Sequence, residues 1–198
     1  MSTYKMFFAG SGGQGVLLMG QMIAQAAMLE GKEATFLPSY GPEMRGGTAN
    51  CTVVVSDKPV SCPLIYEADI AVVMNLPSMD KFEPMVKPGG FLFYNESIID
   101  RKPNRDDIKA VAVDLAARAA KLGNDKVANM VMLGEVVRGT GVVQPETIFK
   151  VFEEKFTVKK AALIPLNKQA FLGEYCKSLN RPFAVFVRQR GGFISRPL

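Results

Sequence analysis

The sequence predicts an α/β protein with a Rossmann-like, doubly wound and mainly parallel sheet, helices on both faces and a helical C-terminal part. Short apolar runs of strand length alternate with runs of helical spacing over most of the 198 residues. This alternation is typical of parallel strands joined by helices. The apolar fraction of 48% and the charged fraction of 22% are those of an ordinary folded protein. We expect one α/β domain over residues 1–180 and a C-terminal tail over 181–198, for which a partner-binding arm is one interpretation.

Each predicted element rests on a local pattern. Apolar runs rich in β-branched or aromatic residues predict strands at 4–9, 34–37, 50–55, 69–74, 90–94 and 109–113. Apolar residues at helical spacing predict helices at 16–30, 115–122, 126–139, 144–156 and 165–178. The sequence Lys-Pro-Gly-Gly at 87–90 predicts a turn before the fifth strand, and 183–187 predicts one short strand in the tail. The first predicted helix ends before Gly31, where a C-cap glycine is common.

The composition excludes several classes of function. Lys and Arg exceed Asp and Glu by 24 − 19 = 5 and are scattered, which favours a small polyanion or an acidic protein over nucleic acid. The chain has no histidine, which excludes Ser-His and Cys-His catalysis and zinc held by histidine. Its three cysteines, Cys51, Cys62 and Cys176, form no closely spaced pair, so we expect no metal site and no disulfide framework. We expect a cytoplasmic protein that neither spans nor binds a membrane, since no signal peptide or long apolar stretch is recognisable.

The stretch FAGSGGQGV at 8–16 places a glycine loop between the first strand and the first helix. Gly10, Gly12 and Gly15 spell G-x-G-x-x-G, a pattern that brings an anion to the N–H groups at a helix start. A dinucleotide site also needs an acidic residue at the end of the second strand, and residues 36–39 contain none. No Lys-Ser or Lys-Thr follows, so this is not a Walker loop. Glycines that only allow close packing remain an alternative.

A second candidate segment lies within PSYGPEMRGGTANCTVVV at 38–55. Residues 40–43 favour a tight turn, and Arg45-Gly46-Gly47 sets a guanidinium beside backbone that a ligand can approach. Arginine in this setting suits bidentate contact with phosphate or carboxylate. The alternative is a surface turn with an ion pair between Glu43 and Arg45. Because the two segments follow the first and second strands, we expect both at one edge of the sheet.

These motifs together support a resemblance. GSGGQGV, followed by SYGPEMRGG and a strand containing cysteine, resembles the gamma subunit of the 2-oxoacid:ferredoxin oxidoreductases over residues 4–178. The resemblance implies a multisubunit enzyme that decarboxylates a 2-oxoacid on thiamine diphosphate, passes electrons through iron–sulfur clusters to ferredoxin, and transfers the acyl group to coenzyme A. It implies alpha, beta and delta partner subunits, separate from this chain, which carry the thiamine diphosphate and the clusters. This chain would help to bind coenzyme A and close the active site, with 2-oxoglutarate as the expected substrate.

The resemblance also implies a set of cofactor-binding residues and no catalytic residue on this chain. The first wall of the site would be Gly10, Ser11, Gly12, Gly13, Gln14 and Gly15, and the second Tyr40, Gly41, Glu43, Arg45, Gly46 and Gly47. We expect Arg45 to contact phosphate, with Glu43 orienting it. A self-sufficient NAD(P)-binding dehydrogenase and a purely structural subunit remain the alternatives.

Three further expectations concern other residues. We expect Cys51 to be a buried, unreactive strand residue, because no base near it in the sequence would form the thiolate. Residues 105–107 are expected to be solvated. Asn129 and Glu135, in an otherwise apolar helix, are candidates for contact with a neighbouring subunit.

Overall fold

The computed structural model describes residues 2–40, 48–155, 162–173, 184–189 and 192–197. Its centre is a six-stranded sheet in the order β2-β3-β1-β4-β5-β6. The strands are β1 (Thr3–Ser11), β2 (Glu33–Tyr40), β3 (Thr48–Ser56), β4 (Ala68–Val73), β5 (Val86–Asn95) and β6 (Lys109–Val113). β1, β4, β5 and β6 pair in parallel, whereas β3 is antiparallel to both of its neighbours, β1 and β2. The mainly parallel sheet is therefore confirmed, and β3 is the strand that runs against the others.

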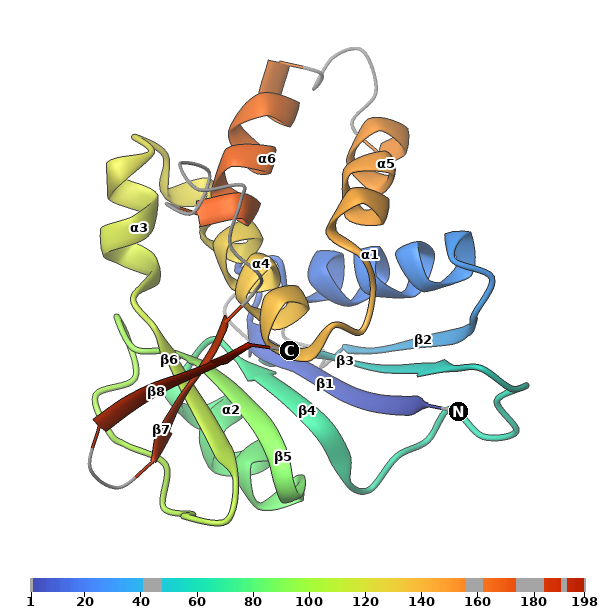
Figure 1. Ribbon diagram of the computed structural model, residues 1–198, viewed down its shortest axis with the longest axis horizontal. Coiled ribbons are helices and arrows are strands. Elements are labelled where there is room, and N and C mark those ends of the chain that lie inside the picture. Colours follow the sequence, from blue (N-terminus) through green and yellow to red (C-terminus); the bar gives the residue numbers. More distant parts are fainter. Residues whose placement is uncertain (1, 41–47, 156–161, 174–183, 190–191, 198) are drawn as a thin grey trace.

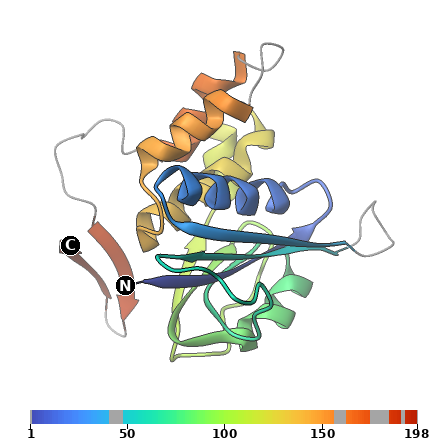
Figure 2. The ribbon, with the colours of Figure 1, turned by 90° about the vertical axis from the view of Figure 1, so that its right-hand side faces the viewer.

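Helices cover both faces of the sheet, as expected (Figures 1 and 2). The α-helices are α1 (Val16–Leu29), α2 (Leu76–Phe82), α3 (Leu115–Lys121), α4 (Ala128–Thr140), α5 (Pro145–Lys155) and α6 (Ile164–Leu172), and the 3₁₀ turns are η1 (Glu83–Met85) and η2 (Asp125–Val127). α1 and α4 lie on one face with α5 and α6 outside them, and α2 lies on the other face. None of the helices in the described part of the chain has the length and apolar character needed to cross a membrane.

Alternating side chains of β1 divide the interior into two cores. Phe8 faces a large core with α1, α4 and α5, whereas Phe7 faces a smaller core with α2. Both phenylalanines are buried, because a central parallel strand is covered on both sides. This is why residues 6–9 form a continuous apolar run rather than an alternating one.

The α2 helix was missed by the sequence analysis. It has seven residues, too few for an apolar period to be recognised. However, two features of the sequence mark its start. The Asn75 side chain caps the helix by accepting a hydrogen bond from the Ser78 N–H at 3.0 Å, and a proline lies in the first turn. Asparagine followed by proline therefore marks this helix more clearly than its apolar residues do.

The turn predicted at 87–90 is wrong, because these residues belong to β5. The pairing with β4 shifts register between Ala68 and Ile70, which leaves extra residues on the β5 side. Gly89 takes a left-handed φ of 76° there, and its N–H donates to the Asp107 carbonyl at 2.7 Å. The glycines that suggested a turn instead form an irregularity within the strand.

A partly buried carboxylate, Glu30, joins the end of α1 to the connection between α4 and α5. Glu30 accepts from the Gln144 N–H at 2.6 Å and pairs with the Lys32 ammonium at 2.9 Å, and that ammonium also donates to the Val142 carbonyl. Partial burial raises the pKa of Glu30, but the hydrogen bonds from Gln144 and Lys32 outweigh it and leave this pKa below its usual value. Glu30 is therefore held as a carboxylate in the folded protein.

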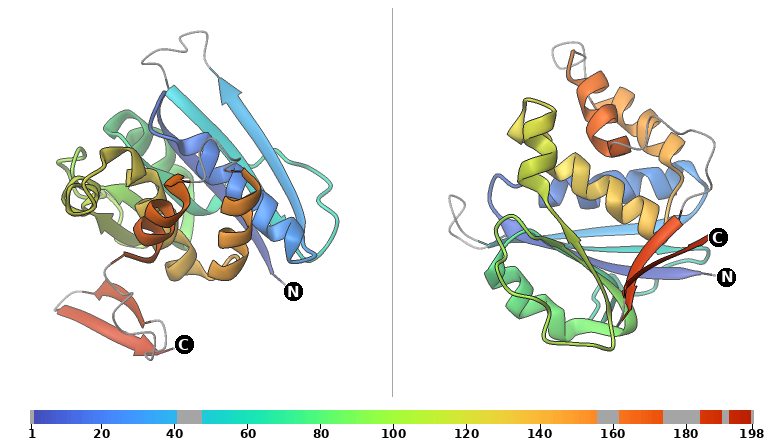
Figure 3. Two further views of the ribbon diagram at one scale, coloured as in Figure 1. Left: turned by 90° about the horizontal axis from the view of Figure 1, so that it is seen from above. Right: turned by 60° about the vertical axis from the view of Figure 1, so that its left-hand side comes forward.

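The C-terminal part differs from expectation at two places. α6 ends at Leu172, before Gly173 with φ 65°, and residues 174–178 of the predicted helix lie outside the described residues. The tail contains two strands, β7 (Ala184–Gln189) and β8 (Gly192–Pro197), paired antiparallel as a separate sheet. Figure 3 shows this pair beside the main sheet rather than within it. Its use as a partner-binding arm remains a prediction.

Candidate functional site

The glycine loop forms the connection from β1 to α1, as predicted. Gly15 is the N-cap of α1 with φ 75° and ψ 19°, and Gly13 has φ 95°. Both lie in the left-handed region of backbone conformation, which residues other than glycine rarely adopt. Gly10 is required for another reason: a Cβ there would lie 2.6 Å from Gln14 Oε1 and 2.8 Å from Met74 Cβ. The loop thus needs its glycines for both conformation and close packing.

The loop lies at the topological switch point of the sheet. From β1 the chain passes through α1 to β2 on one side, and from β4 it passes through α2 to β5 on the other side, with the two helices on opposite faces. The carboxyl ends of the neighbouring strands β1 and β4 therefore open between diverging connections. This is the position at which open α/β sheets bind ligands.

The start of α1 is suited to an anion. Among the described residues no side chain caps this helix, and its first turn contains no acidic residue. The first backbone bond of the helix runs from the Met19 N–H to the Gly15 carbonyl at 3.1 Å, so the amides before it point beyond the helix end. An uncapped helix start carries about half a positive charge and binds phosphate or carboxylate readily.

Side-chain amides hold the loop against the ends of the neighbouring strands. Gln14 Oε1 accepts from the Ser11 N–H at 2.7 Å, and Gln14 Nε2 donates to the Met74 carbonyl at 3.3 Å. Asn75 Nδ2 donates to Ser11 Oγ at 2.6 Å, and Asn95 Nδ2 donates to the same Met74 carbonyl at 3.4 Å. Gln14 was predicted to line the site, and its amide here also braces the loop. Asn75 and Asn95 were missed, although each closely follows an apolar strand run in the sequence.

Asn129 also lies against the glycine loop. A Cβ on Gly15 would be 2.2 Å from Asn129 Nδ2, so the first turn of α4 lies beside the first turn of α1. Asn129 is a candidate for contact with a neighbouring subunit, which stays a prediction, and within this chain its side chain contacts the glycine loop. Glu135, the other residue of that expectation, pairs within the chain with Arg118 and Arg138.

The structure describes the strand ends that flank residues 41–47 of the second predicted wall. β2 ends at Tyr40 and β3 begins at Thr48, and Gly41, Glu43, Arg45, Gly46 and Gly47 lie outside the described residues. Tyr40 pairs with Ala49, and Ala49 pairs on its other side with Gly10. Both ends of the segment 41–47 therefore lie at the sheet edge where the glycine loop begins, as predicted.

Cys51 is buried in its strand, as expected, and its low reactivity remains a prediction. It has no exposed surface, and its Sγ contacts the Val16 carbonyl at 3.8 Å. Burial raises the pKa of the Cys51 thiol to about 12. The thiol faces the Cα of Gly20, where a Cβ would lie 2.5 Å from Sγ. Cys51 thus packs β3 against α1.

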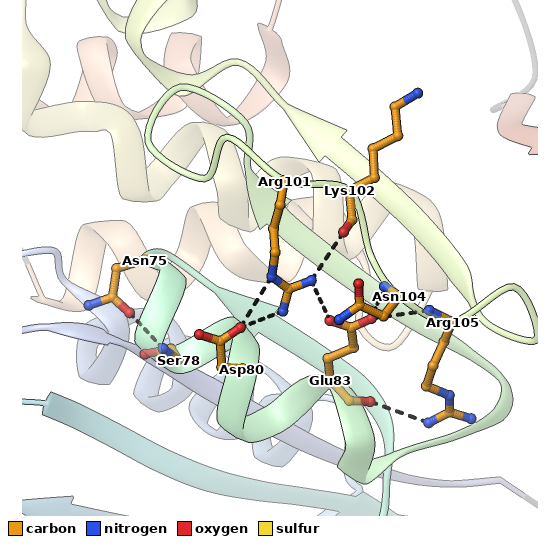
Figure 4. Close-up of polar contacts among 8 residues, drawn as sticks. All are labelled: Asn75, Ser78, Asp80, Glu83, Arg101, Lys102, Asn104 and Arg105. Atoms are coloured by element: carbon orange, nitrogen blue, oxygen red, sulfur yellow. Dashed lines mark hydrogen bonds and ion pairs between the residues drawn. The ribbon is translucent and has the colours of Figure 1, made fainter.

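A second polar cluster lies on the opposite face, around α2 and η1 (Figure 4). The buried Glu83 carboxylate pairs with Arg101 at 2.9 Å and accepts from the backbone N–H groups of Asn104 and Arg105. Arg101 also pairs with Asp80 at 2.6 Å. The prediction that 105–107 is only solvated is wrong for Arg105, whose guanidinium donates to backbone carbonyls of η1 and β5. These contacts anchor the β5–β6 connection to α2 and η1.

Comparison with known proteins identifies the same fold and family. The family described as pyruvate ferredoxin/flavodoxin oxidoreductase matches residues 5–173. The 2-oxoglutarate synthase subunit KorC of Methanocaldococcus jannaschii is 37% identical over 147 residues, which cover 72% of this chain and 78% of that protein. The ketoisovalerate oxidoreductase subunit VorA of Methanothermobacter marburgensis is 41% identical over 126 residues. That match covers 64% of this chain but only 26% of VorA, so the chain spans about a quarter of this relative.

Two solved structures share the fold. The gamma subunit of a keto/oxoacid ferredoxin oxidoreductase from Geobacter sulfurreducens matches with a TM-score of 0.76 and 32% identity, over 86% of this chain and 93% of that one. A 2-oxoglutarate:ferredoxin oxidoreductase from Magnetococcus marinus, solved with 2-oxoglutarate, coenzyme A and succinyl-CoA bound, matches with a TM-score of 0.79 over 86% of this chain and 30% of that one. At 24% identity, this second likeness is one of fold. The resemblance inferred from the two motifs is confirmed: the chain belongs to the pyruvate ferredoxin/flavodoxin oxidoreductase family.

Proposed function

We propose that this chain is the gamma-type component of a multisubunit 2-oxoacid:ferredoxin oxidoreductase and that it helps to bind coenzyme A and close the active site. The observation that carries this proposal is the uncapped start of α1, which lies at the switch point together with both described ends of the segment 41–47. A glycine loop and an arginine segment at one sheet edge suit a ligand with several phosphates.

Coenzyme A fits this arrangement chemically. Its phosphates match the amides of the glycine loop and the guanidinium of Arg45, and its thiol receives the acyl group in the reaction of the family. The formal charge of +5 favours such an anion. This chain contributes binding and positioning, since neither predicted wall contains a histidine or a cysteine, and Glu43 is expected to orient Arg45 rather than to act as a base.

The remaining cofactors belong to partner subunits in this proposal. The chain has no histidine and only three cysteines, which does not fit cluster ligation by four closely spaced thiolates. We propose that thiamine diphosphate and iron–sulfur clusters are held by alpha, beta and delta subunits, and that ferredoxin accepts the electrons. The relative KorC, which this chain matches over most of its length, supports 2-oxoglutarate as the substrate.

The test is coenzyme A binding by the native assembly with Arg45→Ala. Loss of one charge-assisted contact should weaken binding by about 10- to 150-fold, since such a bond contributes about 1.5–3 kcal/mol. Lys150→Ala, which removes an exposed positive charge on α5, is the matched control and should leave the affinity unchanged. An unchanged affinity in Arg45→Ala would favour a purely structural subunit.

Substrate choice is tested separately by viologen reduction with the same assembly. We expect reduction with 2-oxoglutarate that depends on coenzyme A and is faster than with pyruvate or a branched-chain oxoacid. Faster reduction with either competitor would reject 2-oxoglutarate as the substrate while leaving the role in coenzyme A binding intact.

A further inference from the structure

We propose that the Ser11 hydroxyl donates a hydrogen bond to a phosphate of the ligand, and that Asn75 is the positioning residue that keeps this proton available. The inference rests on the proposed function, because it concerns the same anion site. Asn75 was not among the site residues predicted from the sequence. The two residues lie on opposite sides of the switch point, Ser11 at the end of β1 and Asn75 just after β4.

The orientation of the Asn75 amide is fixed by a backbone group. The Ser78 N–H can only donate, and it lies 3.0 Å from one end of the amide. That end must therefore be the oxygen, Oδ1, and the other end must be the nitrogen, Nδ2. Figure 4 shows this capping contact at the start of α2. The nitrogen then faces Ser11 Oγ at 2.6 Å.

This orientation determines what the Ser11 hydroxyl can do. An amide nitrogen only donates, so Ser11 Oγ must accept from Asn75. A hydroxyl has a single proton, and that proton cannot point back along this bond. Within the described part of the chain, Asn75 is the one hydrogen-bond partner of Ser11 Oγ. The proton of Ser11 is thus available to an acceptor outside the described residues.

The surrounding groups make a phosphate the matching acceptor. The Ser11 backbone is already engaged, since its N–H donates to Gln14 Oε1 and its carbonyl accepts from the Gln14 N–H at 3.2 Å. The Met74 carbonyl is likewise engaged, because it accepts hydrogen bonds from the side-chain amides of Gln14 and Asn95. The hydroxyl proton and the free amides of α1 therefore present donors at one edge, which an oxygen-rich anion can accept.

The test is a double-mutant cycle on coenzyme A binding by the native assembly. Ser11→Ala removes the donor and should weaken binding by about 10- to 100-fold. Asn75→Asp retains the helix cap but offers only acceptors, so the Ser11 proton turns toward the new carboxylate and is lost to the ligand. Binding should fall by about 100-fold or more, because the added negative charge also repels phosphate.

The cycle separates these two causes. If Asn75 acts through Ser11, Asn75→Asp should weaken coenzyme A binding less in the Ser11→Ala protein than in the wild-type protein. The two fold-losses in affinity should differ by at least 10-fold. If the loss of affinity in the double variant equals the product of the losses in the two single variants, the new carboxylate of Asn75→Asp acts by its charge alone and the inference is wrong. Asn124→Asp is the matched control, because Asn124 caps η2 through the Lys126 N–H just as Asn75 caps α2. It should leave affinity and melting temperature unchanged.

Failure of this inference is distinguishable from failure of the proposed function. If the wild-type assembly does not bind coenzyme A, the ligand is wrong, and the same cycle is repeated with inorganic pyrophosphate. Pyrophosphate binding is then measured by NMR, from changes in the backbone amide chemical shifts of Gly12 and Gly13. Pyrophosphate binding that shows the same coupling supports the role of Asn75, and absence of binding overturns both proposals.

Discussion

Replacement of Glu83 by alanine tests how the face opposite the candidate site is held together. The Glu83 side chain is only 3% exposed, and its partners come from one segment, the β5–β6 connection. Arg101 pairs with one carboxylate oxygen at 2.9 Å, and the Asn104 and Arg105 amides donate to the other. Removing the carboxylate leaves all three donors without this acceptor (Figure 4).

The expected loss of stability depends on which hydrogen-bond partners each of the three donors keeps after the substitution. Breaking a fully buried ion pair costs about 3–5 kcal/mol, but Arg101 keeps Asp80 as a partner, which reduces this cost. An unpaired buried amide costs about 1–3 kcal/mol, and water can reach the exposed Asn104 more easily than a buried group. We therefore expect Glu83→Ala to lower the free energy of unfolding by about 3 kcal/mol. For a domain of this size that is a fall of about 6–12 °C in melting temperature.

Thermal unfolding followed by circular dichroism measures this effect. Asp80→Asn is the control: Asp80 pairs with the same arginine, but its side chain is 59% exposed, so we expect a loss of at most about 1 kcal/mol. A Glu83→Ala protein that melts within about 2 °C of the wild type, or no lower than Asp80→Asn, would refute the reasoning.

Three other predictions concern the loop, the thiols and pH. Gly15→Ala should destabilise the fold by about 1–3 kcal/mol and more than Gly13→Ala, because both have positive φ but only the Cβ on Gly15 meets a side chain; chemical denaturation compares them. Native protein treated with iodoacetamide at pH 8 should be labelled at the exposed Cys62 and not at Cys51, as read by peptide mass mapping. The lowered pKa of Glu30 adds stability above its unfolded value, near 4.5, that is lost as pH falls through the folded pKa. Glu30→Gln should therefore narrow the difference in melting temperature between pH 7 and pH 3; an unchanged difference would contradict this.

The sequence predicted the strands of the main sheet well because each is a short apolar run between polar connections. It did not predict the direction of β3. The connection between β2 and β3 is too short to contain a crossover helix. This short length is the one sign of antiparallel pairing that the sequence offers. The β5 irregularity was missed because Lys-Pro-Gly-Gly was interpreted as a turn, whereas glycine also occurs at bulges within strands. The second strand of the tail was missed because it begins at Gly192 and ends at Pro197, and neither residue type is typical of strands.

The candidate site was predictable where its residues are contiguous and not where they meet only through the fold. The loop 10–15 is recognisable because a helix start and its glycines are local in sequence. Asn75, which follows β4, and Asn129 of α4 contact that loop, whereas Asn95 of β5 donates to the Met74 carbonyl beside it. No sequence spacing links these residues. Gln14 lies within the motif, yet its bracing contact to the Met74 carbonyl depends on the pairing of β1 with β4.

The reversed strand also distinguishes this sheet from the arrangement that binds dinucleotides. In a fully parallel arrangement, the second strand would pair directly with β1 and present a carboxylate to a ribose. Here β3 separates β1 from β2, so the end of β2 is one strand further from the glycine loop. The hairpin returns the chain to β1 at Thr48, which pairs with Ser11. Thr48 thus lies beside the end of β1, where the glycine loop begins, and the end of β2 does not.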